Sequence, residues 1–110
     1  MTDTWHPVGS AAQLSKAGRL AVEVNELRIG VFLVDGTLYA INNLCTHGNA
    51  CLTDGELDGC LIECPLHAGL FDLRSGKACG APAVKHAQTY PVTIEDGHVL
   101  VQIVTAAAAP

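Results

Sequence analysis

Residues 27–41, with the sequence LRIGVFLVDGTLYAI, contain two apolar-rich segments on either side of an Asp-Gly pair. Every second residue from Leu27 to Leu33 is apolar, which is the spacing of one face of a β-strand. Asp35-Gly36 favours a type I′ turn, because both residues tolerate positive φ. The stretch therefore predicts a β-hairpin.

The same pattern recurs on both sides of this hairpin. Residues 20–24 alternate and end at Asn25-Glu26, and near the end of the chain residues 90–94 and 98–103 flank Asp96-Gly97. Helix is scarce, and the clearest signal is a capping box from Ser10 to Gln13, with Gly18 closing a short turn. Short strands at regular spacing predict an all-β sandwich or barrel. We expect one domain over residues 1–110, with a frayed tail at 105–110.

The composition indicates a globular protein that does not bind nucleic acid. Apolar residues make up 49% of the chain and charged residues 15%, which excludes a disordered protein. The net charge is −5, whereas phosphate binding needs clustered Lys and Arg. The apolar runs are too short to cross a bilayer, and the first twenty residues lack the features of a signal peptide. We expect a cytoplasmic protein with no membrane contact.

Two short segments carry the candidate chemistry: Cys45-Thr46-His47-Gly48 and Cys64-Pro65-Leu66-His67-Ala68-Gly69. Each supplies one thiol and one imidazole, and each follows an expected strand. Mixed pairs at this spacing fit a single tetrahedral zinc ion poorly, because zinc sites usually combine Cys-Cys with His-His pairs. Two adjacent irons fit better, because two His can replace two Cys on one of them. Cys45, His47, Cys64 and His67 are therefore candidate ligands of a 2Fe–2S cluster, with a structural zinc site as the alternative.

Histidine ligation also changes the charge of such a cluster. With two thiolates and two neutral imidazoles the oxidised cluster carries a charge of about zero, against about −2 with four thiolates. An added electron is accepted more readily by the neutral cluster. The two histidines therefore predict a raised reduction potential.

The paired motif, Cys-x-His followed after sixteen residues by Cys-x-x-His, resembles the Rieske signature. The wider stretch 45–82 is similar to the Rieske ferredoxins of bacterial aromatic-ring-hydroxylating dioxygenases. The resemblance implies a six-stranded antiparallel β-sandwich with a small cluster-binding β subdomain at about residues 43–71. It also implies a proline-containing loop over the cluster, for which Pro82 is the candidate.

The same resemblance implies a soluble, monomeric electron carrier that is not itself an enzyme. Such a ferredoxin takes single electrons from a flavin reductase that uses NAD(P)H. It passes them to a terminal Rieske non-haem iron oxygenase in the degradation of aromatic compounds. The alternative within the Rieske class is the small subunit of another oxidoreductase, of the nitrite reductase or arsenite oxidase type.

One departure separates this chain from the Rieske proteins of cytochrome bc complexes, which pair two further cysteines as a disulfide. Leu66 stands where the cysteine of the second loop would lie. The missing disulfide favours a potential at the low end of the Rieske range, about −150 mV.

Other reactive side chains have simpler expected roles. The remaining cysteines are expected to be buried or half-buried thiols: Cys51, Cys60 and Cys79. Three histidines are expected in strands, at the surface or an interface: His6, His86 and His98. Trp5 is expected to be a core or edge anchor. Four acidic residues between the two motifs either dock a basic partner or form a solvated face: Asp54, Glu56, Asp58 and Glu63.

Overall fold

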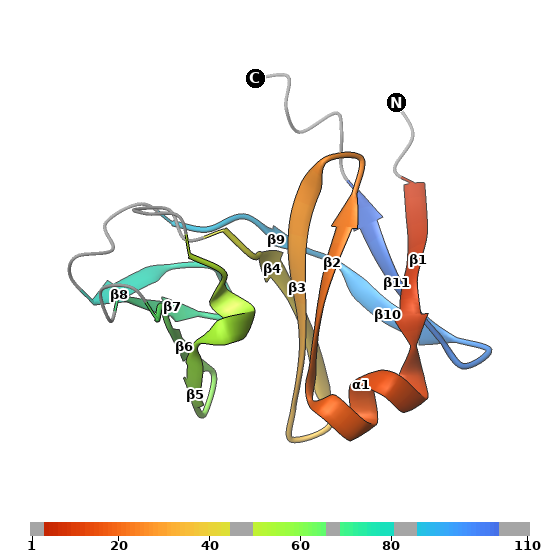
Figure 1. The fold of residues 1–110 in the computed structure, drawn as a ribbon, viewed down its shortest axis with the longest axis horizontal. Coiled ribbons are helices and arrows are strands. Elements are labelled where there is room, and N and C mark those ends of the chain that lie inside the picture. The colour runs from red at the N-terminus through yellow and green to blue at the C-terminus, as the bar shows by residue number, and fades with distance from the viewer. Residues whose placement is uncertain (1–3, 45–49, 66–68, 81–85, 104–110) are drawn as a thin grey trace.

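The computed structural model describes residues 4–44, 50–65, 69–80 and 86–103, and its strands form three antiparallel sheets. Figure 1 shows the sheet β1-β11-β10 packed against the sheet β2-β3-β4-β9, with the small sheet β5-β6-β7-β8 beside them. The strands are β1 (Thr4–Ser10), β2 (Arg19–Val24), β3 (Leu27–Val34), β4 (Thr37–Asn42), β5 (Glu56–Asp58), β6 (Leu61–Glu63), β7 (Leu70–Asp72), β8 (Ala78–Gly80), β9 (Thr89–Tyr90), β10 (Val92–Glu95) and β11 (His98–Ile103). The helical elements are α1 (Ala11–Ala17) and the 3-10 turn η1 (Leu52–Asp54). The predicted all-β class is confirmed.

The hairpin turns adopt the backbone that their residues predict. Asp35-Gly36, between β3 and β4, has φ values of 51° and 79°, and Asp96-Gly97, between β10 and β11, has 52° and 78°. Positive φ at both central positions defines a type I′ turn, whose twist matches that of the flanking strands. Asn25-Glu26 turns in the same way between β2 and β3, with φ values of 49° and 70°.

The predicted capping box begins α1. Ser10 Oγ accepts a hydrogen bond from Gln13 N at 3.0 Å, and Gln13 Oε1 accepts one from Ser10 N at 3.0 Å. Gly18 ends the helix with φ of 81° and donates its N–H to Leu14 O at 2.7 Å. None of the helices within the described ranges is long and apolar enough to cross a membrane.

The sheet β2-β3-β4-β9 is a middle layer with two buried faces. On β3, Ile29 and Val31 belong to the core shared with Val99 of the three-stranded sheet. Phe32 belongs to a second core, shared with Ile62 of the small sheet. Alternate residues of one strand thus enter different cores, because successive side chains point to opposite faces.

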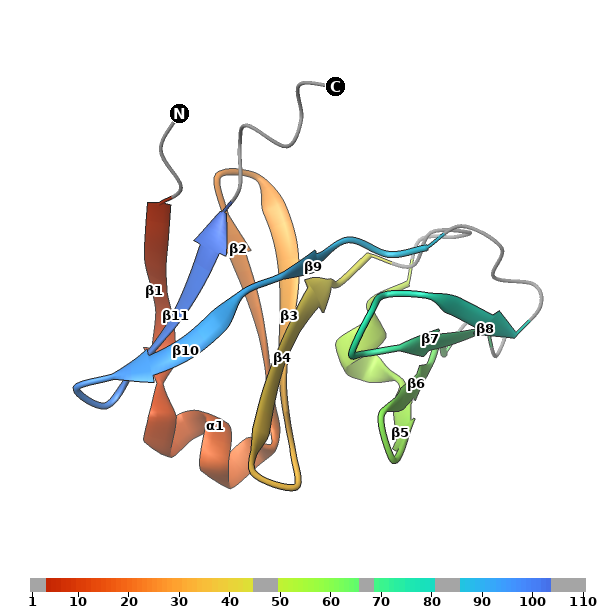
Figure 2. The ribbon, with the colours of Figure 1, turned by 180° about the vertical axis from the view of Figure 1, so that it is seen from behind.

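The strands β9 and β10 are separated only by Pro91 and lie in line in Figure 2. β9 pairs with β4, whereas β10 pairs with β11, so this one segment contributes to both sheets of the sandwich. When β9 and β10 are counted as one strand, the described sandwich has the six strands that the family resemblance implies.

The small sheet extends from Glu56 to Gly80, past the expected subdomain boundary at Phe71. The extension is β8, which pairs with β7 through Phe71 and Ala78. Small residues such as Ala78 and Gly80 carry little strand signal, so the sequence does not indicate this strand. The predicted frayed tail at 105–110 lies outside the described residues.

Candidate metal centre

Three of the four predicted ligands, Cys45, His47 and His67, lie outside the described residues. The structure describes the fourth, Cys64, and the residues at which both ligand-bearing loops begin and end. The framework of the site is therefore defined by the chain on either side of each loop.

The first loop, residues 45–49, is flanked by residues that pair with each other. Leu44 and Cys51 form an isolated antiparallel bridge. One position further out, Leu52 N donates to Asn43 O at 2.7 Å. The loop thus connects β4 to η1 across a closed base.

Asn43 joins this base to its surroundings through four hydrogen bonds. Its backbone N–H donates to Arg28 O at 2.8 Å, and its O accepts from Leu52 N. Its side-chain Nδ2 donates to Thr53 Oγ1 at 2.9 Å, and its Oδ1 accepts from Thr53 N at 2.8 Å. Asn43 is only 3% exposed and is the one buried polar residue in the described part of the chain. A buried amide is stable when its donors and acceptors are paired in this way.

Arg19 on β2 holds η1 from the sandwich side. Its Nη1 donates to Thr53 O at 2.9 Å and to Gly55 O at 2.7 Å. Its guanidinium lies over the Phe32 ring, 5.5 Å from the centroid. Gly30 on β3 allows Thr53 of η1 to lie close to this strand. A Cβ at residue 30 would lie 2.9 Å from Thr53 Cγ2.

The second loop follows β6. Cys64 is 1% exposed and belongs to the same core as Phe32 and Phe71. Its N–H donates to Gly69 O at 2.7 Å, which continues the pairing of β6 with β7. The predicted position of Cys64 in a loop just after a strand is confirmed.

The bases of the two loops lie against each other. Leu52 of the first base and Cys64 of the second belong to one core, against which Ala50 also packs. A Cβ on Gly55 would overlap Glu63 O, so only glycine allows η1 to lie this close to β6. The structure therefore brings the described bases of the two predicted ligand loops into contact.

A third segment ends nearby. Pro82, the predicted covering residue, lies in 81–85, outside the described residues. After it, His86 Nδ1 accepts a hydrogen bond from Ala78 N at 3.0 Å, which requires that nitrogen to be unprotonated. The prediction that His86 lies in a strand is wrong: it is an exposed residue ahead of β9, and the backbone bond that it accepts fixes its place beside β8.

The three cysteines outside the ligand motif differ in exposure. Cys51 and Cys60 are half-buried, as predicted, and Cys60 Sγ lies 3.7 Å from Tyr39 Oη. The prediction for Cys79 is wrong, because it is exposed on β8. β8 is an edge strand of the small sheet as described, so the Cys79 side chain has same-face neighbours from one adjacent strand only. None of the four described cysteines forms a disulfide.

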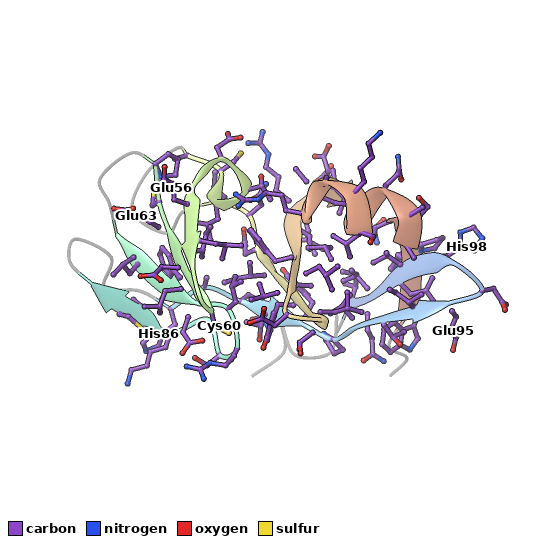
Figure 3. The ribbon with its side chains drawn as sticks, turned by 90° about the horizontal axis from the view of Figure 1, so that it is seen from below. Glu56, Cys60, Glu63, His86, Glu95 and His98 are labelled. Carbon is purple, nitrogen blue, oxygen red and sulfur yellow. The ribbon has the colours of Figure 1, made fainter. Side chains whose placement is uncertain are left out.

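Two residues outside the ligand motif, His98 and Trp5, lie on the sheet β1-β11-β10. His98 is exposed on β11, and Trp5 is 41% exposed on β1, which is an edge strand of its sheet. Figure 3 shows His98 and Glu95 together at the end of the sandwich opposite the small sheet.

Of the acidic residues between the motifs, Asp54 ends η1, and Glu56, Asp58 and Glu63 lie on strands of the small sheet. Asp54, Glu56 and Asp58 are exposed, and Glu63 is half-buried. Glu56 and Glu63 are direct cross-strand partners and lie side by side in Figure 3. A different carboxylate, Asp72, is neutralised: Arg74 donates to its oxygens at 3.0 and 2.9 Å and holds the pKa of that carboxyl below its ordinary 3.8.

The surroundings of Cys64 suit a metal ligand. The thiolate form of cysteine binds metals, and burying this charge among apolar side chains is unfavourable unless a cation compensates it. A ferric ion bound by Cys64 would supply that compensation. Elsewhere in the described ranges, no three His, Cys, Asp or Glu side chains are placed to hold a metal ion.

Comparison with known proteins agrees with this site. The family model described as "Rieske [2Fe-2S] domain" matches residues 4–91. The ferredoxin component of the naphthalene 1,2-dioxygenase/salicylate 5-hydroxylase systems of Ralstonia sp. is 42% identical over 103 residues, covering 94% of this chain and 99% of that protein.

Solved structures give the same result for the fold. A ferredoxin of Sphingomonas yanoikuyae B1 superposes with a TM-score of 0.84 at 41% identity, over 92% of this chain and 100% of that one. A structure titled as a complex of reduced oxygenase and oxidized ferredoxin in carbazole 1,9a-dioxygenase contains a chain with a TM-score of 0.80 at 33% identity, over 88% of this chain and 91% of that one. The chain therefore belongs to the family of Rieske domains, whose cofactor is one 2Fe–2S cluster.

Proposed function

We propose that Cys45 and Cys64 bind one iron of this cluster and that His47 and His67 bind the other. The buried position of Cys64 at the end of β6 supports this assignment, as does the contact between the bases of the two loops. When bound, the cluster accepts and returns one electron at a time. The chain's own residues hold the ligands and exclude water from the thiolate side.

We infer that the protein is the electron-transfer ferredoxin of an aromatic dioxygenase system, taking electrons from an NAD(P)H-linked flavin reductase and delivering them to a terminal Rieske oxygenase. The observation that carries this proposal is the near full-length match to a ferredoxin component of such a system. The related ferredoxin crystallised with its oxygenase supports the choice of partner. The net charge of −5 suits transient docking on basic surfaces.

The alternative, a small Rieske subunit of another oxidoreductase, differs in how the protein associates. A shuttle is a monomer that binds each partner briefly, whereas a subunit stays with its partner during size-exclusion chromatography. Because the relatives named above are ferredoxin components, we expect a monomer.

Iron and sulfide analysis with EPR spectroscopy tests the ligand assignment. Cys45→Ser should abolish the 2Fe–2S signal, whereas Cys79→Ser, an exposed cysteine outside the motif, should retain it. A fully loaded Cys45→Ser variant would contradict the assignment. Protein-film voltammetry should give a one-electron wave at about −150 mV, and a wave several hundred millivolts higher would favour the subunit alternative.

His67→Cys tests the role of the histidines. If a cluster still assembles, replacing a neutral imidazole by a thiolate adds negative charge and should lower the potential. A loaded variant with an unchanged or higher potential would show that histidine does not tune the cluster in this way.

A further inference from the structure

We propose that Arg19, Asn43 and Thr53 form a positioning device, called the strap below, which fixes the base of the first ligand loop and thereby sets the lifetime and potential of the cluster. This inference rests on the proposed ligand assignment. None of the three residues is a proposed ligand, and none belongs to the Cys-x-His or Cys-x-x-His motif.

The first part of the strap is the pair Asn43 and Thr53. Their two reciprocal hydrogen bonds, at 2.8 and 2.9 Å, join the end of β4 to η1. These two elements are the chain on either side of residues 45–49. Asn43 lies two positions before the proposed ligand Cys45, so rotation of Asn43 would displace the start of the loop. Together with the backbone bond from Leu52 N to Asn43 O, the pair therefore constrains the separation and direction of the two loop ends.

The second part is the bond from Arg19 to the sandwich. Its guanidinium bonds the carbonyls of Thr53 and Gly55 at once. It also lies over Phe32, which shares a core with the proposed ligand Cys64. Movement of η1 away from the sandwich would break both bonds together. The strap thus ties the first ligand loop to the core on which the second loop is built.

Arg19 also adds a positive charge in this region. Among the described residues the only ion pair is Arg74 with Asp72, so no described carboxylate neutralises Arg19, which faces two carbonyl oxygens and the Phe32 ring. A cation in a partly buried position favours a nearby group that gains an electron. Arg19 is therefore expected to raise the reduction potential, in addition to its positioning role.

The experiment uses the loaded protein and three matched variants. Thr53→Val removes the hydroxyl but keeps the shape of the side chain, and leaves Asn43 Nδ2 without its acceptor. Thr53→Ser keeps the hydroxyl. Ile29→Ala is the stability control, because Ile29 is fully buried and its side chain belongs to the other core.

The main readout is the rate at which the visible absorbance of the cluster disappears after an iron chelator is added, well below the unfolding temperature. Thr53→Val should lose the cluster about tenfold faster, which is the effect of leaving one buried donor unpaired. Thr53→Ser should stay within about twofold of the parent protein, since its hydroxyl can still accept the bond. Ile29→Ala should release the cluster no faster than Thr53→Ser.

The potential supplies a second readout. Arg19→Met should shift the voltammetric wave to a lower potential. Arg19→Lys keeps the charge but not the planar guanidinium that lies over Phe32, so it should release the cluster faster with a smaller shift. Equal release rates for Thr53→Val and Thr53→Ser would overturn the positioning role, as would equal acceleration by Ile29→Ala. An unchanged potential in Arg19→Met would overturn the charge effect.

The outcome also separates this inference from the ligand assignment. If the parent protein holds a cluster that Cys45→Ser abolishes, while all strap variants behave as the parent does, only the strap is wrong. If Cys45→Ser keeps its cluster, the ligand assignment itself is wrong.

Discussion

Replacing Ile62 by alanine tests whether the small sheet depends on its core. Ile62 lies on β6, is 0% exposed, and belongs to the same core as Cys64, which follows two positions later in the chain, just after the strand. The substitution removes about three methylene equivalents at about 0.8 kcal/mol each, or about 2.4 kcal/mol. The residual cavity adds to this loss, so the expected destabilisation falls between about 2 and 5 kcal/mol. Because a domain of this size has roughly 5–15 kcal/mol of stability, the variant should still fold.

Thermal unfolding followed by circular dichroism measures the effect. At about 4–8 °C per kcal/mol, the Tm should fall by roughly 10 °C or more. Ile29→Ala is the matched control, because the same side chain is removed from the core between the two sandwich sheets. Both variants should lose similar stability, but only Ile62→Ala should also accelerate loss of the cluster. A loss below about 0.5 kcal/mol would show that Ile62 is not enclosed as described.

Three further substitutions test separate contacts. Gly55→Ala should destabilise the protein by about 1–3 kcal/mol in chemical denaturation, because the added Cβ would overlap Glu63 O. The backbone itself is not the cause, since the φ of −88° at this position is unstrained for alanine. A neutral effect would contradict the close packing of η1 on β6. Glu56→Lys should stabilise the protein by about 0.2–1 kcal/mol, because it turns a like-charged cross-strand pair with Glu63 into an opposite-charged one. Asp58→Lys, whose cross-strand partner is Leu61, changes the net charge equally and should not give this gain in Tm at low salt. Asp72→Asn should lower the Tm slightly at pH 7, because the bond from Arg74 holds the pKa of Asp72 below 3.8 in the folded protein. That contribution is present above pH 3.8 and is lost as the pH falls through the lowered pKa, so parent and variant should converge in strongly acidic buffer; a constant difference would exclude this ion pair as the cause.

Local sequence patterns predict those parts of the fold that neighbouring residues determine. The Asp-Gly turns and the capping box of Ser10 depend on neighbouring residues, and both form as predicted. The strand β8 depends on its pairing with β7, and the place of His86 depends on a hydrogen bond from Ala78, eight positions earlier. Their sequences, rich in small or polar residues, give no periodic signal of that pairing.

The candidate site also has parts that the sequence reveals and parts that only the structure shows. The ligand motif is visible because its residues are chemically distinctive, whereas the residues that fix its base are not. Asn43 is an ordinary polar residue next to an apolar strand, and only the structure shows that it is buried and bonded to Thr53. The contact between Arg19 and Thr53 spans 34 positions, and no local spacing indicates it.

The middle sheet β2-β3-β4-β9 has two buried faces because it contributes to two different cores. On β3, Val31 packs in the core between the two sandwich sheets, whereas the adjacent Phe32 packs in the core that contains Cys64 and Leu52, the first residue of η1. A one-residue slip of β3 would exchange these faces and remove Phe32 from beneath Arg19. The register of a strand that contains no proposed ligand therefore affects the core on which the bases of the two ligand loops meet. We expect substitutions on that face of β3 to affect cluster retention more than equally buried substitutions on the other face.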